Sequence, residues 1–333
     1  MRAELATPAA TRAVVERRFR AMGTHCHVVV VGGDPGLADR AVHQVDALES
    51  RWSRFRPGSD VSRLNAAAGR PVPVHHDTMG LLERAVTART GTDGWFDPFL
   101  VRHLEAAGYD RDLAELAPPP LVAGRTTTPI GPSAHGEPLR ERAPIELHRR
   151  RGTARLLGGA GFDPGGIGKG LAADLVSGWL LAHGADGALV NLGGDLRVRG
   201  PAPDGGVWRV GIDDPLAARP TDISHTGDGD GPATGPSVAT VELSDAGLCT
   251  SSPLRRRWTA PDGTPAHHVL DPRTGRPGPV EVASVTVTAP EAWRAEALAT
   301  AVLLAGPVFG AALLRRNGAD GLAVALGGCV GPV

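Results

Sequence analysis

The order in which strand-like and helix-like segments follow one another restricts the fold of this chain more than any other feature. Short valine-rich or alternating runs predict strands, whereas apolar residues spaced three and four apart predict helices. The two kinds of segment do not alternate regularly, as a doubly wound parallel sheet would require. We therefore predict an α+β fold in which mixed or antiparallel sheets pack against helices. The predicted strands are 25–31, 207–212, 239–243 and 284–288, and the predicted helices are 37–52, 76–88, 169–183, 291–304 and 308–316.

Two segments rich in proline and glycine interrupt this pattern. Residues 118–144 and 201–236 have a composition that disfavours regular structure, and we interpret both as loop insertions. The second contains the sequence GDGDG at 227–231, which lacks the distal glutamate of a calcium loop and is interpreted as a solvated loop. The expected organisation is a flexible N-terminal segment, 1–16, followed by a single domain over 17–331.

Composition excludes several classes of function. The chain has 35 Lys and Arg against 36 Asp and Glu, so no broad basic surface indicates a nucleic-acid partner. Cys26, Cys249 and Cys329 lack C-x-x-C spacing, which argues against a disulfide framework or a zinc knuckle. Charged residues are scattered through the N-terminal region where a secretory signal needs an apolar stretch. No apolar run approaches the roughly 20 residues that a membrane helix requires, so we expect a cytoplasmic protein without membrane insertion.

A glycine-rich segment with one lysine carries the densest chemical signal. Residues 162–170, FDPGGIGKG, run directly into the helical pattern that follows. Glycines let backbone N–H groups approach an anion, the helix N-terminus adds the positive end of a dipole, and Lys169 adds a charge. Because Gly170 follows Lys169 in place of Ser or Thr, this is not a Walker loop. The segment predicts a phosphate cradle, and the alternative is a glycine-rich turn that caps a helix.

Two further polar segments follow predicted strands. The sequence NLGGD at 191–195 lies where a strand ends in a tight turn, and we favour a structural role in that turn over catalysis. The sequence HHVLDPRTG at 267–275 begins with two histidines. Neighbouring residues of a strand point to opposite faces, so at most one histidine would face a given site. That histidine could accept a proton from a hydroxyl nucleophile, although a hydrogen-bonded structural role is the alternative.

The helix predicted over 291–304 carries a pair of oxygen ligands. Glu296 and Thr300 are four residues apart, which places a carboxylate and a hydroxyl on one face of the helix, one turn apart. Oxygen ligands suit a hard cation such as Mg²⁺. A solvent-facing pair on an amphipathic helix is the alternative.

Taken together, these segments resemble the ApbE flavin transferase family, the FAD:protein FMN transferases. The resemblance covers nearly the whole chain, and the order of the motifs makes it far more specific than any one of them. The matching segments are Met22-Gly23-Thr24, 53–65, 93–98, 162–170, 191–195, 249–252, 267–275 and the helix around Glu296.

The resemblance implies an enzyme that uses Mg²⁺ to transfer FMN from its substrate FAD to a Thr or Ser hydroxyl of an acceptor flavoprotein, releasing AMP. It implies that His268 is the base. It assigns the Mg²⁺ ligands to the carbonyl of Gly166, to Glu296 and to Thr300. The residues that would contact FAD are Met22, Phe55, Trp95, Phe96, Asp97, Asp163, Lys169 and Val269.

The chain departs from the family pattern at three of these places. The family usually has aspartate at the position of Glu296, glycine at the position of Ser252, and often tyrosine at the position of Phe55. Two other functions remain open at this point. One is a Mg²⁺-dependent FAD pyrophosphatase that gives free FMN and AMP, and the other is a non-catalytic FAD-binding protein.

Overall fold

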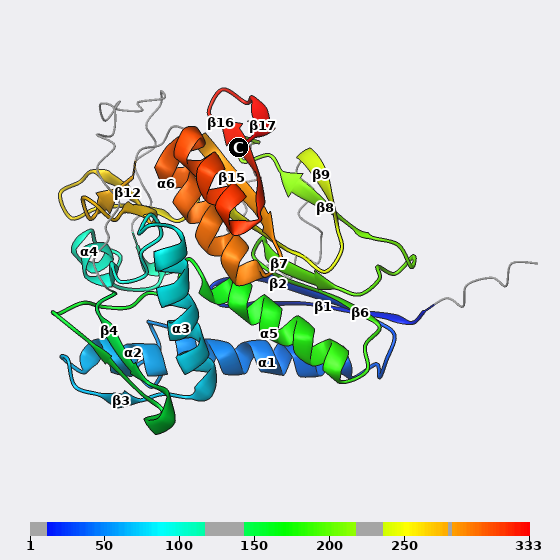
Figure 1. The fold of residues 1–333 in the computed structure, drawn as a ribbon, viewed down its shortest axis with the longest axis horizontal. Helices are drawn as coiled ribbons and strands as arrows, with labels where there is room; N and C mark the ends of the chain where they lie inside the picture. The colour runs from blue at the N-terminus through cyan, green and yellow to red at the C-terminus, as the bar shows by residue number, and fades with distance from the viewer. Residues whose placement is uncertain (1–11, 117–142, 218–235, 279–281) are drawn as a thin grey trace, which may run out of the picture.

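A central antiparallel sheet of eight strands organises the molecule, as the computed structural model shows (Figure 1). The structure describes residues 12–116, 143–217, 236–278 and 282–333. Every pairing within the central sheet is antiparallel. The predicted α+β class is thereby confirmed. In spatial order the strands are β1 (Val14–Ala21), β2 (Thr24–Val31), β6 (Gly187–Leu192), β7 (Asp195–Arg199), β10 (Gly247–Ser251), β15 (Val282–Ala289), β16 (Asp320–Ala325) and β17 (Val330–Pro332).

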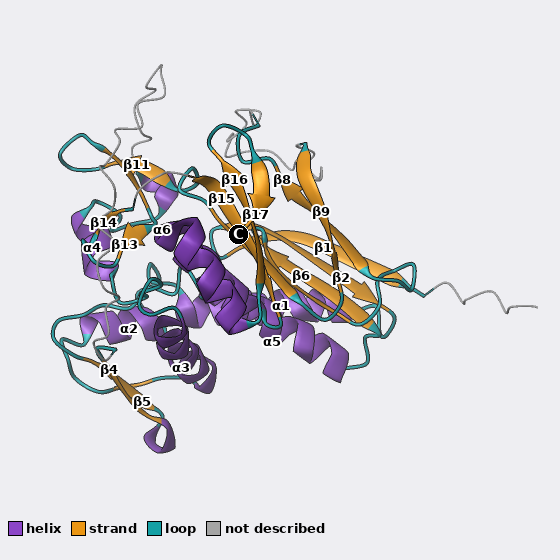
Figure 2. Ribbon diagram, turned by 45° about the horizontal axis from the view of Figure 1, so that its top comes forward, coloured by secondary structure: helices purple, strands orange, loops and turns teal. Residues whose placement is uncertain are grey.

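Three long helices cover one face of this sheet (Figure 2). They are α1 (Leu37–Trp52), α5 (Gly168–Ala182) and α6 (Ala292–Asn317). Their apolar faces and the facing strand residues form the main hydrophobic core, which runs from Ala21 to Ala319. Because α5 and α6 start side by side at one end of this layer, residues far apart in the sequence meet there.

Smaller elements surround the main layers. Helices α2 (Asp60–Ala66), α3 (His76–Gly91) and α4 (Val101–Ala106) lie beside a three-stranded sheet, at the left of Figure 1. That sheet contains β3 (Val72–Pro73), β5 (Thr153–Leu156) and β4 (Ile145–His148). Two-stranded sheets are formed by β8 (Trp208–Asp213) with β9 (Ser237–Leu243), β11 (Arg257–Thr259) with β12 (Pro265–His267), and β13 (Leu270–Asp271) with β14 (Arg276–Pro277). Short 3₁₀ turns occupy Leu113–Glu115 and Arg149–Arg151.

The valine run of β2 is buried on both faces of the sheet. Val28 and Val30 point into the main core against the helices. Val29 and Val31 point to the opposite face, where the β8–β9 hairpin covers them. Successive residues of a strand alternate between faces, so a strand covered on both sides is apolar at every position. This explains why the run shows no alternation.

Most predicted elements are confirmed within a few residues, and the predicted N-terminal boundary is wrong. The strand predicted at 25–31 is β2, and the helix predicted at 37–52 is α1. Val14 pairs with Val31, so β1 already begins inside the expected flexible segment 1–16. Residues 1–11, most of 118–144, and 218–235 with its GDGDG sequence lie outside the described residues.

Helix α6 combines the two helices predicted over 291–304 and 308–316. Its 26 residues are interrupted at Gly306, which has φ 75° and ψ 176°. A Cβ atom on Gly310 would lie 2.8 Å from Cγ1 of Val302, although eight residues of straight helix would separate them by about 12 Å. Asp320, just after α6, also pairs with Thr288, just before it. The second half of α6 therefore folds back along the first.

Helix α6 contradicts the expectation that no apolar run approaches the length of a membrane helix. By length and composition α6 could cross a membrane, because its most apolar window has a mean hydropathy of 2.1. In the sequence, Glu296 and the Gly306-Pro307 pair interrupt this stretch. In the structure 61% of that window is buried, and the break at Gly306 leaves neither half with the roughly 20 residues that span a bilayer. Here the stretch forms part of the core.

The buried side of β6 gives a test of the sheet-to-helix packing. Leu192 is fully buried in the main core, whereas Leu216 is exposed. We expect Leu192→Ala to lower the free energy of unfolding by about 2–5 kcal/mol, because it leaves a cavity in a closely packed layer. Leu216→Ala should change it by less than about 0.5 kcal/mol. Urea unfolding followed by circular dichroism measures both, and equal effects of the two variants would contradict this packing.

Candidate functional site

A cluster of one ammonium and two carboxylates lies where α5, α6 and β7 begin. Lys169 Nζ donates to Glu296 Oε1 at 2.9 Å and also to the carboxylate of Asp195. The side chain of Lys169 is 16% exposed, that of Glu296 3% and that of Asp195 5%. Charged groups so far from solvent are stable only when they are paired. The cluster carries two negative charges and one positive charge, so it favours an additional cation.

The glycine-rich segment that precedes α5 forms a tight turn against Phe96. The Pro164 carbonyl accepts hydrogen bonds from the backbone N–H groups of Ile167 (3.1 Å) and Gly168 (2.7 Å). A Cβ atom on Gly166 would lie 2.8 Å from the Phe96 ring and 3.7 Å from Thr300 Oγ1. Any larger residue at 166 would therefore have to displace the Phe96 ring or move this turn away from it. Both functions predicted from the sequence, a helix-capping turn and an anion cradle, need this close backbone approach.

The structure brings the three predicted magnesium ligands together. Glu296 and Thr300 lie one turn apart on α6, and Gly166 packs against Thr300. Thr300 Oγ1 lies 2.9 Å from Ser251 Oγ at the end of β10. A carboxylate, hydroxyls and a backbone carbonyl are the hard oxygen donors that Mg²⁺ prefers. By donor chemistry and by charge, these residues fit a divalent cation.

His268, the predicted base, directly follows β12. The side chain is partly exposed, but its Nδ1 is buried and has no hydrogen-bond partner among the described residues. Burial lowers the pKa of this imidazole well below its usual value, and nearby positive charges, including Lys169, lower the pKa further. A neutral ring with a free lone pair can accept a proton from a hydroxyl. His267 is engaged elsewhere, because its Nε2 lies 3.2 Å from the Gly278 carbonyl oxygen.

The loop after α3 places two predicted flavin-contacting aromatic residues next to the histidine segment. Trp95 and Phe96 are mostly buried. The guanidinium of Arg273, which follows the histidines in the sequence, lies 4.2 Å from the centre of the Trp95 ring. Asp97 has both oxygens in structural bonds: Arg89 Nε donates to one at 2.9 Å and the Phe99 N–H to the other at 2.9 Å. Its role as a flavin contact stays a prediction.

Asp163 and Phe55 meet through Arg54. Arg54 Nε lies 3.9 Å from Asp163 Oδ1, and its guanidinium lies 4.3 Å from the centre of the half-exposed Phe55 ring. Asn65 and Phe162 fasten the two motifs together, because Asn65 Nδ2 donates to the Phe162 carbonyl (2.9 Å) and the Phe162 N–H donates back to Asn65 Oδ1 (2.7 Å). Motifs almost 100 residues apart in the sequence thus share one surface.

The remaining two predicted contacts, Met22 and Val269, lie at the edge of the main core. Met22 occupies the two-residue turn between β1 and β2 and has φ 51°, a left-handed conformation that is rare for a residue with a side chain. Strain of this kind occurs more often at functional sites than elsewhere. Val269 is buried in the core, and its carbonyl accepts a hydrogen bond from Gly278 N–H at 2.9 Å. Their contacts with FAD stay predictions.

Two site residues were not singled out from the sequence. Asp195 was interpreted as a turn residue, but it is Asn191 that fills that role by accepting the Gly194 N–H at 2.8 Å, while Asp195 pairs with Lys169. Ser251 was noted only as part of a motif. The sequence feature that could have identified both is a polar residue at one end of a strand: Asp195 begins β7, and Ser251 ends β10. The backbone at the neighbouring Ser252 is not left-handed, so this position does not require the glycine that is usual in the family.

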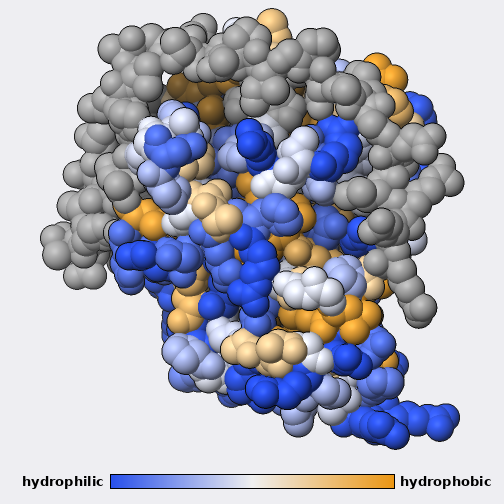
Figure 3. Space-filling view, turned by 90° about the vertical axis from the view of Figure 1, so that its left-hand side faces the viewer, coloured by the Kyte–Doolittle hydropathy of each residue, from blue (hydrophilic) through white to orange (hydrophobic). Residues whose placement is uncertain are grey.

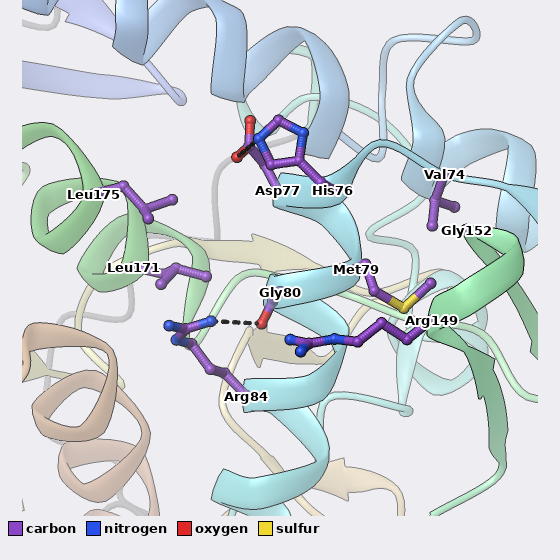
Figure 4. Close-up of a pocket in the computed structure, with 10 residues that line it drawn as sticks. All are labelled: Val74, His76, Asp77, Met79, Gly80, Arg84, Arg149, Gly152, Leu171 and Leu175. Carbon is purple, nitrogen blue, oxygen red and sulfur yellow. Dashed lines mark hydrogen bonds and ion pairs between the residues drawn. The ribbon is translucent and has the colours of Figure 1, made fainter. Parts of the chain in front are cut away.

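One hollow among the described residues does not include this cluster. It is bounded by α3, α5 and the β4–β5 hairpin and contains none of the predicted site residues (Figure 4). Its lining residues are Val74, His76, Asp77, Met79, Gly80, Arg84, Arg149, Gly152, Leu171 and Leu175. We place the site at the ion cluster, because the hollow contains none of the residues predicted for the site and its one carboxylate, Asp77, is already paired with Arg51.

A histidine-rich group at the start of α3 does not change this assignment. Nitrogen and oxygen atoms of His75, His76 and Asp77 lie within 4.8 Å of one another. Asp77 is already paired with Arg51 at 2.7 Å, and His75 accepts the Asp77 N–H as the helix cap. A metal ion there would face the guanidinium and the positive end of the helix.

Figure 3 shows the end of the molecule with α2, α3 and α4, where hydrophilic side chains predominate among the described residues.

Comparisons with known proteins show which family the chain resembles over most of its length. Over 316 residues the chain is 32% identical to the "FAD:protein FMN transferase" of Treponema pallidum, covering 90% of this chain and 82% of that protein. It is 26% identical over 318 residues to the protein of the same name in Escherichia coli, covering 93% and 84%.

Solved structures give the same result. The ApbE protein of Thermotoga maritima superimposes with a TM-score of 0.77 at 26% identity, covering 96% of this chain and 97% of that one. The flavinyl transferase ApbE of Pseudomonas stutzeri superimposes with a TM-score of 0.72 at 25% identity, covering 98% and 96%. A sequence model of the ApbE family matches residues 22–325, which include every residue of the ion cluster. The chain therefore belongs to the ApbE family.

Proposed function

We propose that this protein is a magnesium-dependent FAD:protein FMN transferase. It binds FAD, transfers the FMN part to a threonine or serine hydroxyl of an acceptor flavoprotein, and releases AMP. The observation that carries the proposal is the ion cluster of Lys169, Glu296 and Asp195 next to Thr300. The names of the relatives, which match this chain over most of their length, support the same activity.

The residues of the cluster suit the pyrophosphate of FAD. Lys169 is the second residue of α5 and so adds its charge at the positive end of the helix, where phosphate groups bind favourably. Glu296, Thr300 and the Gly166 carbonyl would hold Mg²⁺, which supplies neutralisation of the charge that develops on the phosphate oxygens. Trp95 and Phe96 provide aromatic surface for the flavin end of the same substrate.

His268 supplies the proton acceptor. The acceptor hydroxyl gives its proton to the imidazole and forms a bond to the FMN phosphorus, and the bond from that phosphorus to the oxygen of AMP breaks. AMP leaves with the electron pair of the broken bond. The lowered pKa of His268 keeps the ring neutral at neutral pH, so that it is ready to accept the proton.

Intact-mass analysis distinguishes this function from its alternatives. A flavoprotein domain with a candidate Thr or Ser acceptor is incubated with this protein, FAD and Mg²⁺. We expect a mass increase equal to an FMN phosphoester, lost on addition of EDTA. Release of FMN and AMP without any adduct, in the presence of several acceptor domains, would instead identify a pyrophosphatase. Intact FAD with every divalent cation would identify a binding protein.

Removal of the predicted base should separate binding from catalysis. We expect His268→Ala to bind FAD with little change but to transfer FMN about 10²–10⁴-fold more slowly, because a base acts on the reaction and not on ground-state binding. Mass analysis of reactions quenched at timed intervals measures the rate of transfer, and quenching of flavin fluorescence measures FAD binding. His148→Ala, at an exposed histidine of β4, is the control. Unchanged transfer by His268→Ala would remove this residue from the mechanism.

The buried His267 also predicts a dependence of stability on pH. Burial lowers the pKa of His267 to about 4, so the unfolded chain binds a proton near pH 6.5 that the folded protein does not bind until about pH 4. The free energy of unfolding should therefore fall as the pH decreases from 6.5 to 4, by up to about 1.4 kcal/mol per pH unit for this one group.

The variant His267→Gln isolates this contribution from those of other groups. Urea unfolding at pH 6.5 and pH 4.5 should show a smaller loss of stability in the variant than in the unchanged protein, since the variant lacks the titrating ring. Equal losses in the two proteins would show that His267 is not held neutral by the fold.

The cytoplasmic location predicted from the sequence stays a prediction, and fractionation of cells that express the full chain tests it.

A further inference from the structure

The two helices that carry the ion cluster lack caps of their own. Helix α5 begins at Gly168 after Ile167, and α6 begins at Ala292 after Glu291. The side chains of Ile167 and Glu291 accept no hydrogen bond from a backbone N–H of their own helices. The first backbone N–H groups of a helix have no partner within the helix, so buried ones need acceptors from elsewhere.

Each helix receives its missing acceptor from the other. Asp174 of α5 accepts hydrogen bonds from the backbone N–H groups of Ala292 and Trp293, both at 3.0 Å. Glu296 of α6 accepts the backbone N–H of Gly170 through Oε2 at 2.8 Å. The two carboxylates thus cap the helices reciprocally. On each helix the carboxylate that caps the other helix lies four residues, or about one turn, after a backbone N–H that is itself capped. We call these two groups of hydrogen bonds the reciprocal cap.

Close backbone contacts hold the reciprocal cap in one geometry. A Cβ atom on Gly170 would lie 2.5 Å from the Ala292 carbonyl oxygen, and one on Gly247 of β10 would lie 2.4 Å from Ala292 Cα. Arg197 of β7 places its Nε 3.4 Å from Asp174 Oδ1 and donates to the carbonyl of Pro290, directly before α6. The start of α6 is therefore fixed from three elements, and Asp174 lies at the centre of these contacts.

The reciprocal cap determines which oxygen of Glu296 faces the site. Oε2 accepts from Gly170 N–H, so Oε1 is the oxygen that faces the ion cluster, where it accepts from Lys169 Nζ at 2.9 Å. A rotation of the first turn of α6 would move both oxygens together. We propose that Asp174 is a positioning residue, which acts through the reciprocal cap to fix Glu296 Oε1 for a divalent cation.

The cation belongs to the proposed function, whereas the reciprocal cap does not depend on it. Two measurements on the full chain therefore test the proposal. Hydrogen–deuterium exchange reports the N–H groups of Gly170, Ala292 and Trp293. Titration with Mn²⁺, followed by the loss of its free electron-paramagnetic-resonance signal, reports cation affinity without any turnover.

Asp174→Ala should affect both helices and the cation. We expect exchange to increase about tenfold or more at Ala292 and Trp293, which lose their acceptor, and also at Gly170, whose acceptor on α6 is no longer held. The Kd for Mn²⁺ should rise at least about fivefold. Asp174→Asn, which keeps the side-chain volume and one acceptor oxygen, should give smaller changes in the same direction, and it serves as the test if Asp174→Ala does not fold.

Asp60→Ala is the matched control. Asp60 is another buried aspartate that accepts a backbone N–H, from His75 at 2.8 Å, and a hydroxyl, from Thr78 at 2.6 Å. Its removal should increase exchange around His75 and leave Gly170 and the Kd for Mn²⁺ unchanged. If the Asp174 variants leave exchange at Gly170 unchanged, or if Asp60→Ala changes the Kd equally, the proposal is wrong. If even the unchanged protein binds no Mn²⁺ while Gly170 responds to Asp174→Ala, the reciprocal cap stands and the metal part of the proposed function fails.

Discussion

The pairing of Lys169 with two buried carboxylates is the interaction on which the site depends. Desolvation of three charged groups is unfavourable, and their mutual attraction offsets it only when their geometry is closely maintained. The surrounding elements supply that geometry: α5 carries Lys169, β7 begins with Asp195, and α6 carries Glu296. Each side chain lies near the start of its element: Lys169 is the second residue of α5, Asp195 the first of β7 and Glu296 the fifth of α6. The cluster keeps one negative charge in excess, a property that favours cation binding more than stability.

The elements themselves could be predicted from the sequence because their signals are local. Helix α1 shows an apolar stripe, and β2 shows a short valine run that ends in a Gly-Gly turn. The break at Gly306 was also visible, since Gly-Pro separates two helical patterns. What the sequence did not show is that the second half of α6 returns along the first. That result depends on β16 pairing beside β15, a contact that no local pattern encodes.

The candidate site was predicted in part, and the missing part has a common cause. Lys169 was identified from its glycine-rich segment, and Glu296 and Thr300 from their spacing of four residues on a predicted helix. The family resemblance assigned all three to one site, and they do meet in the structure. Asp195 was assigned to its turn, because Asn and Asp in a glycine-rich turn usually bond their own backbone. Asp174 gave no signal at all: a single aspartate within a helical pattern looks like any other, and its partners lie 118 and 119 residues away. Carboxylates that act across elements can be recognised only when the elements are placed.

The length of the side chain at position 296 follows from the same contacts. A glutamate reaches Gly170 N–H with one oxygen and Lys169 with the other, so the longer side chain joins the helix cap and the ion cluster. An aspartate on the same backbone is shorter by one methylene and could not reach as far toward both partners. The extra length is therefore matched to the spacing between α5 and α6, which the contact of Gly170 with Ala292 sets. A departure from the usual family residue is thus accommodated by the backbone around it, and Lys169 remains within reach of both carboxylates.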